Sequence, residues 1–154
     1  MEKKLIVLSG IPGSGKSTYA QDYVRAHPDN SFIVASDEIR LGLFGRVDDF
    51  SKEDMVWNIF ETLVREKAKV HSTIIADSSA TTNVRRLRWA KLFRHLFTKI
   101  ELVYFDIPFA TCLERNEKRH LTIPYEDMLV MNEAFERPSQ EVIAAYDSII
   151  YVNK

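Results

Sequence analysis

The sequence predicts an α/β domain in which a five-stranded, mostly parallel sheet is covered by helices on both faces. Two observations predict it: short runs rich in isoleucine and valine recur along the chain, and helical patterns separate them. Continuous rather than alternating hydrophobicity is typical of parallel strands that are buried on both faces. Strands that alternate with helices imply right-handed crossovers and three layers.

Length and composition indicate a single soluble domain over residues 1–154. Of the 154 residues, 45% are hydrophobic and 28% are charged, so one core can hold the fold without disulfides. Cys112 is the only cysteine, which excludes an internal disulfide and a cysteine-based zinc site and favours a reducing, cytoplasmic location. The apolar run before Gly10 is too short for a signal peptide or a membrane span.

The apolar runs give the expected strands, and the patterns between them give the helices. Strands are expected over residues 5–8, 32–35, 73–76, 100–105 and 149–152. Helices are expected over residues 16–26, 37–44, 83–97, 108–119, 124–136 and 140–145, with a longer helix that starts at residue 51.

Two helix starts carry capping signals. Ser51 and Asp54 resemble a capping box, and Asn83 is a candidate cap for the basic helix that follows it. Trp57 and Trp89 lie in helical patterns and are expected to anchor the core. The apolar face of the helix after Ser51 is expected to hold Met55, Ile59, Phe60, Leu63 and Val64.

Residues 10–17, GIPGSGKS, match the phosphate-loop pattern G-x-x-x-x-G-K-[ST] between an expected strand and an expected helix. Glycines permit the positive φ angles that turn backbone N–H groups toward an anion, and the helix dipole adds positive potential. Lys16 would reach the β- and γ-phosphates, and the Ser17 hydroxyl would bind Mg²⁺. The alternative is a glycine-rich turn without a ligand. The expected nucleotide contacts are Gly13, Ser14, Gly15, Lys16, Ser17 and Thr18.

Two carboxylates follow expected strands, where ligands of such sheets bind. Asp37 could accept a proton from an attacking hydroxyl, with Arg40 one turn later on the same helix face. It could equally cap the short helix. Asp77 follows the third expected strand, where a carboxylate can help hold Mg²⁺. The alternative interpretation is that Asp77 only forms a turn.

Arg115 and Arg119 are spaced i, i+4, so a helix would project both from one face. Such a pair can close over nucleotide phosphates and neutralise charge in the transition state. The alternative is a solvated helix end in which Glu114 and Lys118 form a surface pair.

Five stretches in order, GIPGSGKST, SDEIR, ADSSATTNVRR, YFDIPFATCLERNEKR and TIP before a long helix, carry a resemblance to a known family. Together they resemble the kinase domain of the phage-type polynucleotide 5′-hydroxyl kinases. The resemblance implies a P-loop NTPase fold with a helical lid and implies ATP and Mg²⁺ as cofactors. It also implies that Asp37 is the general base and that Arg40 contacts the phosphate next to the acceptor hydroxyl. The remaining implied site residues are Lys16 and Ser17 at the phosphates, Asp77 at the metal, and Arg115 and Arg119 in the lid.

The function expected from the residues and the resemblance is transfer of the γ-phosphate of ATP to a hydroxyl, foremost the 5′-OH end of DNA or RNA. A kinase of a small hydroxylated metabolite or antibiotic and a nucleotide-dependent binding or switch module remain alternatives. Phage-type enzymes also carry a phosphatase domain with a D-x-D-G-T motif. The sequence lacks that motif, so removal of 3′ phosphates is not expected.

The formal net charge of −1 conceals a basic segment. Residues 85–119 hold nine lysines and arginines against four acidic residues, a local charge of +5. Nucleic-acid binding depends on such a local patch rather than on the overall charge, and a membrane partner is not expected. Before the arginine pair, the basic residues are Arg85, Arg86, Arg88, Lys91, Arg94 and Lys99.

Overall fold

A five-stranded sheet forms the centre of the protein in the computed structural model, which describes residues 2–119 and 122–154. The strand order is β2-β3-β1-β4-β5, and every neighbouring pair is parallel. The five expected strands are therefore confirmed, and the sheet is entirely parallel. The strands are β1 Lys4–Ser9, β2 Ser31–Ala35, β3 Thr73–Asp77, β4 Lys99–Phe105 and β5 Ser148–Val152.

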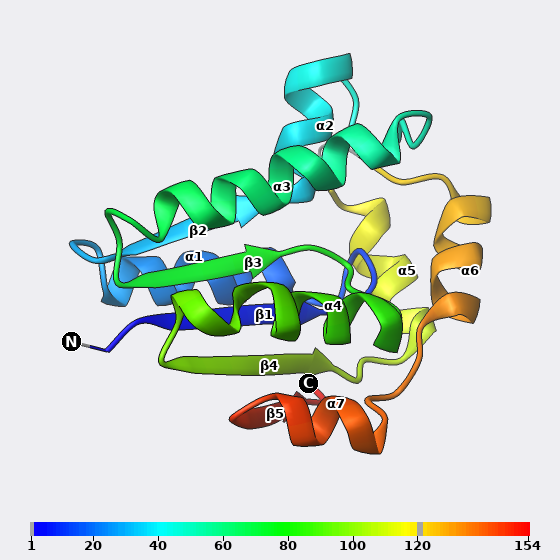
Figure 1. Ribbon diagram of the computed structural model, residues 1–154. Helices are drawn as coiled ribbons and strands as arrows, with labels where there is room; N and C mark the ends of the chain where they lie inside the picture. Colours follow the sequence, from blue (N-terminus) through cyan, green and yellow to red (C-terminus); the bar gives the residue numbers. More distant parts are fainter. Residues whose placement is uncertain (1, 120–121) are drawn as a thin grey trace.

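Helices cover both faces of the sheet, as Figure 1 shows with α3 and α4 in front of it and α1 behind it. Because side chains alternate along a strand, Leu5 and Val7 pack under α3, α4 and α7, whereas Ile6 and Leu8 pack against α1. The expected three layers are confirmed. The helices are α1 Lys16–Ala26, α2 Ser36–Phe44, α3 Glu53–Lys67, α4 Asn83–Phe93, α5 Phe109–Glu117, α6 Tyr125–Ala134 and α7 Gln140–Ala145.

The lid consists of α5 and α6, which lie beyond the carboxyl ends of the strands (Figure 1). A separate buried cluster fixes the lid there by joining the phosphate loop, the segment after α2 and both lid helices. Its members are Ile11, Val47, Cys112, Ile123 and Met128. The lid therefore packs against the phosphate loop and not against the main core.

The expected start of α3 is wrong in two respects. The helix begins at Glu53 with Lys52 at the cap position and without a side-chain cap, because Ser51 donates to the Asp49 carboxylate instead. Its buried face includes Val56, Phe60 and Val64. Met55 is 47% exposed, so the apolar face is rotated away from it.

The expected cap of α4 is also wrong. Thr82 caps the helix, since its hydroxyl accepts a hydrogen bond from the Arg85 backbone N–H at 3.2 Å. Asn83 is the first helical residue, and its side-chain oxygen accepts from Arg86 and from the Ser139 backbone. The helix ends at Phe93, where a short 3₁₀ turn, η1 Arg94–Leu96, replaces the expected last turn.

Within the described ranges, no helix combines the length and the apolar character needed to cross a membrane. Helix α3 is the longest at 15 residues and carries charged side chains at both ends. The expected cytoplasmic location stays a prediction.

Candidate active site

The phosphate loop connects β1 to α1 in a conformation that two glycines make possible. Gly13 has φ 86° and Gly15 has φ 101°, both in the left-handed region that favours glycine. A Cβ atom on Gly13 would lie 2.3 Å from the Cys112 carbonyl oxygen of α5. Gly15 occupies the cap position of α1 without a side-chain cap, so the backbone donors of the first turn remain available to an anion.

This contact predicts that Gly13→Ala weakens ATP binding by about tenfold or more. The strained backbone and the clash with Cys112 each cost of the order of 1–3 kcal/mol, and about 1.4 kcal/mol is a factor of ten in affinity. Titration with a fluorescent ATP analogue measures the loss. Gly42→Ala is the matched control, because nothing lies within 4 Å of its added Cβ and alanine favours the helix. Equal affinity of the two variants would contradict this reasoning.

Lys16, Ser17 and Asp77 come together at the end of β1 and β3. The Ser17 hydroxyl donates to the Asp77 carboxylate at 3.1 Å, and the Lys16 ammonium donates to the Ile11 carbonyl at 3.2 Å. Asp77 is 8% exposed, and burial raises the pKa of its carboxyl although Lys16 and Ser17 oppose this. Burial likewise lowers the pKa of Lys16, against the attraction of Asp77 and Asp37. The Lys16 ammonium and the Asp77 carboxylate are thus desolvated charges, which a bound phosphate and a metal ion would compensate.

Asp37 lies between two arginines. Its carboxylate accepts a hydrogen bond from Arg40 at 3.1 Å and lies 3.6 Å from an Arg119 nitrogen. Helix α2 has Ala35 at its cap position and no side-chain cap hydrogen bond, so Asp37 does not cap it. The carboxylate instead faces the cleft described below, where a proton acceptor would be needed.

Arg40 is held from several sides and is only 5% exposed. It donates to both oxygens of Glu53, at 3.0 and 2.6 Å, in a two-pronged ion pair. Its guanidinium carbon lies 4.9 Å from the ring centre of Phe50 and 5.5 Å from that of Trp57. These contacts leave few of its N–H groups for a ligand and fix the group that contacts Asp37.

Arg115 and Arg119 both line the cleft that contains the phosphate loop, although they do not lie on one helix face. Arg115 belongs to α5 and donates to the Gly13 carbonyl at 3.4 Å. Helix α5 ends at Glu117, so Arg119 lies in the turn beyond it, where its backbone N–H donates to the Asn116 carbonyl. The expectation of one helical face is therefore wrong, but the turn still directs Arg119 toward Asp37.

A cleft of about 770 Å³ unites these groups. It is lined by every expected site residue except Ser14. The Ser14 side chain is buried under the loop, its hydroxyl has no partner among the described residues, and its backbone N–H donates to Ile11. The volume is typical of a site for a small ligand or cofactor. The expected residues in the lining are Gly13, Gly15, Lys16, Ser17, Thr18, Asp37, Arg40, Asp77, Arg115 and Arg119.

Sequence reasoning missed Glu53, Trp57 and Ser78 among the residues of the cleft. Glu53 pairs with Arg40, and Trp57, expected in the core, lines the cleft four residues later on α3. The i, i+4 spacing of Glu53 and Trp57 could have indicated that both side chains lie on one face of the helix. Ser78 also lines the cleft, and its buried hydroxyl has no partner among the described residues. Trp89, in contrast, is fully buried as expected.

Most of the basic segment turns inward or pairs within the chain, which corrects the expectation of one basic patch. Arg86 is fully buried, Arg88 forms a two-pronged pair with Glu61, and Arg94 pairs with Asp147 at 2.7 Å. Of these three side chains only Arg86 is buried, whereas Arg88 and Arg94 are exposed and have their charge paired with a carboxylate.

Comparison with known proteins places these features in a family. The family model described as an AAA domain, AAA_33, matches residues 5–138. The chain is 26% identical over 137 residues to the L-seryl-tRNA(Sec) kinase of Methanococcus maripaludis, covering 87% of this chain and 53% of that protein. It is 27% identical over 135 residues to a protein of Autographa californica nuclear polyhedrosis virus assigned as a bifunctional polynucleotide kinase/RNA ligase.

The likeness extends to a solved structure of similar identity. A chain of the Pnkp1/Rnl/Hen1 RNA repair complex is 28% identical and superimposes with a TM-score of 0.65, covering 87% of this chain and 43% of that one. The viral protein is matched over 79% of this chain but only 19% of its own length. The chain thus spans about half or less of the length of these relatives.

Both curated relatives are named as kinases, and the range matched by the family model includes the phosphate loop, both carboxylates and the lid arginines. The resemblance to a polynucleotide-kinase-like P-loop domain is therefore confirmed, together with the fold. With 134 of its 154 residues inside the matched range, the chain belongs to the AAA_33 family of P-loop kinase domains.

Proposed function

We propose that this protein transfers the γ-phosphoryl group of ATP to the 5′-hydroxyl end of a polynucleotide. The observation that carries the proposal is the position of Asp37, which lines the same cleft as the phosphate loop and lies between Arg40 and Arg119. A carboxylate so placed can accept the proton of a hydroxyl that attacks a phosphate held by the loop. The polynucleotide acceptor is supported by the names of the viral relative and the RNA repair complex.

The residues present fit Mg²⁺ bound together with ATP. Ser17 and Asp77 offer two oxygen ligands in hydrogen-bond contact, and the described residues contain no group of three His, Cys, Asp or Glu side chains that could hold a metal by itself. A site with few protein ligands suits Mg²⁺, which usually retains waters and binds substrate phosphates. When bound, the ion would neutralise charge on the β- and γ-phosphates.

The arrangement of the side chains supports one proposed reaction. The acceptor oxygen forms a bond to the γ-phosphorus while its proton passes to Asp37, and the bond from that phosphorus to the β–γ bridging oxygen breaks. ADP leaves with the bond electrons. Lys16, Arg115 and Arg119 would neutralise the charge on the phosphoryl oxygens, and the rigid Arg40–Glu53 pair would keep Asp37 aligned.

A labelling assay tests the acceptor. With labelled ATP and Mg²⁺, we expect label on DNA or RNA oligonucleotides that carry a 5′-OH and none on the same oligonucleotides with a 5′-phosphate. Chelating Mg²⁺ should abolish the transfer. Label on small hydroxylated metabolites but on no oligonucleotide would support the metabolite alternative, and slow ATP hydrolysis with no acceptor at all would support a switch. Either result would overturn the proposal.

A further inference from the structure

Arg85, in the first turn of α4, differs from the other arginines near it. Its guanidinium carbon lies 4.4 Å from the ring centre of Trp57 and 5.7 Å from that of Trp89. Within residues 2–119 and 122–154, its side chain has neither a hydrogen bond nor an ion pair. The two arginines closest in sequence are both used within the chain, since Arg86 binds backbone carbonyls and Arg88 binds Glu61.

The surroundings of Arg85 favour an external anion. The side chain is half-buried, and this loss of water lowers the pKa of its guanidinium, although the nearby Glu61 and Glu53 carboxylates oppose the shift. An arginine remains charged under these conditions, so its unfilled donors attract an acceptor. The guanidinium carbon lies over the Trp57 ring, and the N–H groups, which have no partner among the described residues, can donate to a phosphate in a two-pronged manner.

Contacts connect Arg85 through Trp57 and Arg40 to Asp37, the proposed proton acceptor. Trp57 lines the cleft and also contacts the Arg40 guanidinium at 5.5 Å, and Arg40 in turn donates to Asp37 at 3.1 Å. These contacts link α2, which carries Asp37 and Arg40, through Trp57 of α3 to Arg85 of α4. The groups expected to hold ATP approach Asp37 from the phosphate loop and from the end of α5. Trp57 thus stands between two guanidiniums, and only that of Arg40 is neutralised by carboxylates.

We propose that Arg85 binds a phosphate of the acceptor strand beyond the one nearest the 5′-hydroxyl. The inference rests on the proposed function and deepens it, because it makes the preferred substrate a strand of at least three nucleotides with two internucleotide phosphates. A small hydroxylated metabolite or a dinucleotide lacks the group that Arg85 would bind. Arg85 acts here on binding of the strand and not on the reacting atoms.

The effect is measured with a series of short acceptors and one variant. For the wild type, we expect KM to fall by about tenfold or more between a 5′-OH dinucleotide and a trinucleotide, as for a hydrogen bond between charged groups. Arg85→Gln should remove this gain and leave kcat and the KM for ATP unchanged. The slope of log KM against log salt concentration should fall by about 0.7, the value for one phosphate contact on a single strand.

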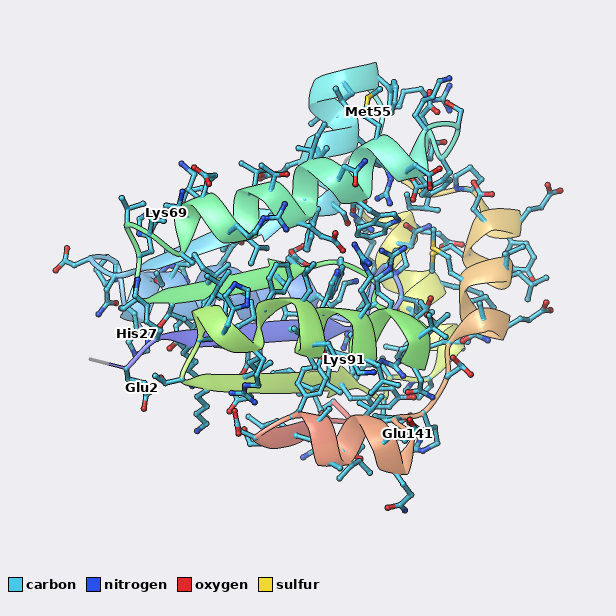
Figure 2. All side chains as sticks on the ribbon, in the orientation of Figure 1. Glu2, His27, Met55, Lys69, Lys91 and Glu141 are labelled. Carbon is cyan, nitrogen blue, oxygen red and sulfur yellow. The ribbon has the colours of Figure 1, made fainter. Side chains whose placement is uncertain are left out.

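Lys91→Gln is the matched control. Lys91 is an exposed cation on the same helix, labelled in Figure 2, and its removal changes the net charge equally. For Lys91→Gln, we expect KM to fall between the dinucleotide and the trinucleotide as it does for the wild type. Arg85→Lys retains the charge without the planar fork and should keep part of the gain.

A substrate change tests the inference without any variant. Replacing the second internucleotide phosphate by a neutral methylphosphonate should raise KM for the wild type and have no effect on Arg85→Gln, as coupled partners in a double-mutant cycle behave. If the wild type labels oligonucleotides but tolerates this replacement, the assignment of Arg85 is wrong and the proposed function stands. If the wild type labels no oligonucleotide, both are wrong.

Discussion

Asp37→Asn is expected to lower kcat for phosphoryl transfer by about 10²- to 10⁴-fold, the usual contribution of a general base. Asparagine keeps the shape of the side chain and can still accept the hydrogen bond that Arg40 donates, but it cannot take the proton of the acceptor hydroxyl. ATP affinity should be retained, since the phosphate loop is untouched and Arg119 loses only its contact with the carboxylate. Rapid-quench kinetics for transfer and a separate titration for ATP binding distinguish these effects.

The control for Asp37→Asn is the same change at an exposed position. Asp22 on α1 forms a surface pair with Arg25, and Asp22→Asn is expected to leave kcat unchanged. Unimpaired transfer by Asp37→Asn would show that another group accepts the proton. Loss of ATP binding along with transfer would show that Asp37 orders the nucleotide site instead of acting on the acceptor.

The sheet was predictable because its physical signal is local. Buried parallel strands need continuous apolar side chains, and the five runs of the sequence match the five strands within a residue at either end. Helix starts depend on competition between neighbouring polar groups, which the sequence does not resolve. At the start of α3, Asp49 takes the Ser51 hydrogen bonds, and at the start of α4, Thr82 caps the helix while Asn83 binds Arg86 and Ser139.

The site residues that directly follow a strand could be predicted from the sequence. Asp37 and Asp77 line the cleft because the carboxyl ends of β2 and β3 lie side by side in the sheet. Glu53 and Trp57 were missed because their approach depends on how α3 crosses the sheet, a property of packing. The direction of a charged side chain is equally hidden in the sequence. Arg86 belongs to the basic segment by sequence and to the core by structure.

Arg86 joins three segments that the active site depends on. Its guanidinium donates to the Ser9 hydroxyl at the end of β1, to the Ala80 and Thr81 carbonyls after β3, and to the Glu136 carbonyl after α6. Its guanidinium carbon also lies 5.6 Å from the ring centre of Tyr104. The Ser9 and Ala80 contacts flank the point where the Gly10 backbone N–H of the phosphate loop donates to the Ser79 carbonyl at 2.9 Å.

Arg86→Met is therefore expected to lower the free energy of unfolding by about 1.5–3 kcal/mol, the contribution of a hydrogen bond that involves a charged group. Methionine fills part of the volume, but the Glu136 carbonyl loses the donor that Arg86 supplies, and the Ala80 and Thr81 carbonyls keep only the hydrogen bonds from the Ser9 hydroxyl and the Glu136 backbone. Urea unfolding measures the change, and Arg25→Met, which removes an exposed arginine from α1, should stay within about 0.5 kcal/mol of the wild type. A loss below about 1 kcal/mol for Arg86→Met would show that the network is dispensable. The contacts of Arg86 with Ser9 and Ala80 also hold the phosphate loop against the segment after Asp77. ATP affinity of Arg86→Met, measured at a temperature where the variant remains folded, should therefore fall as well. Arg25→Met should change neither the free energy of unfolding nor the ATP affinity.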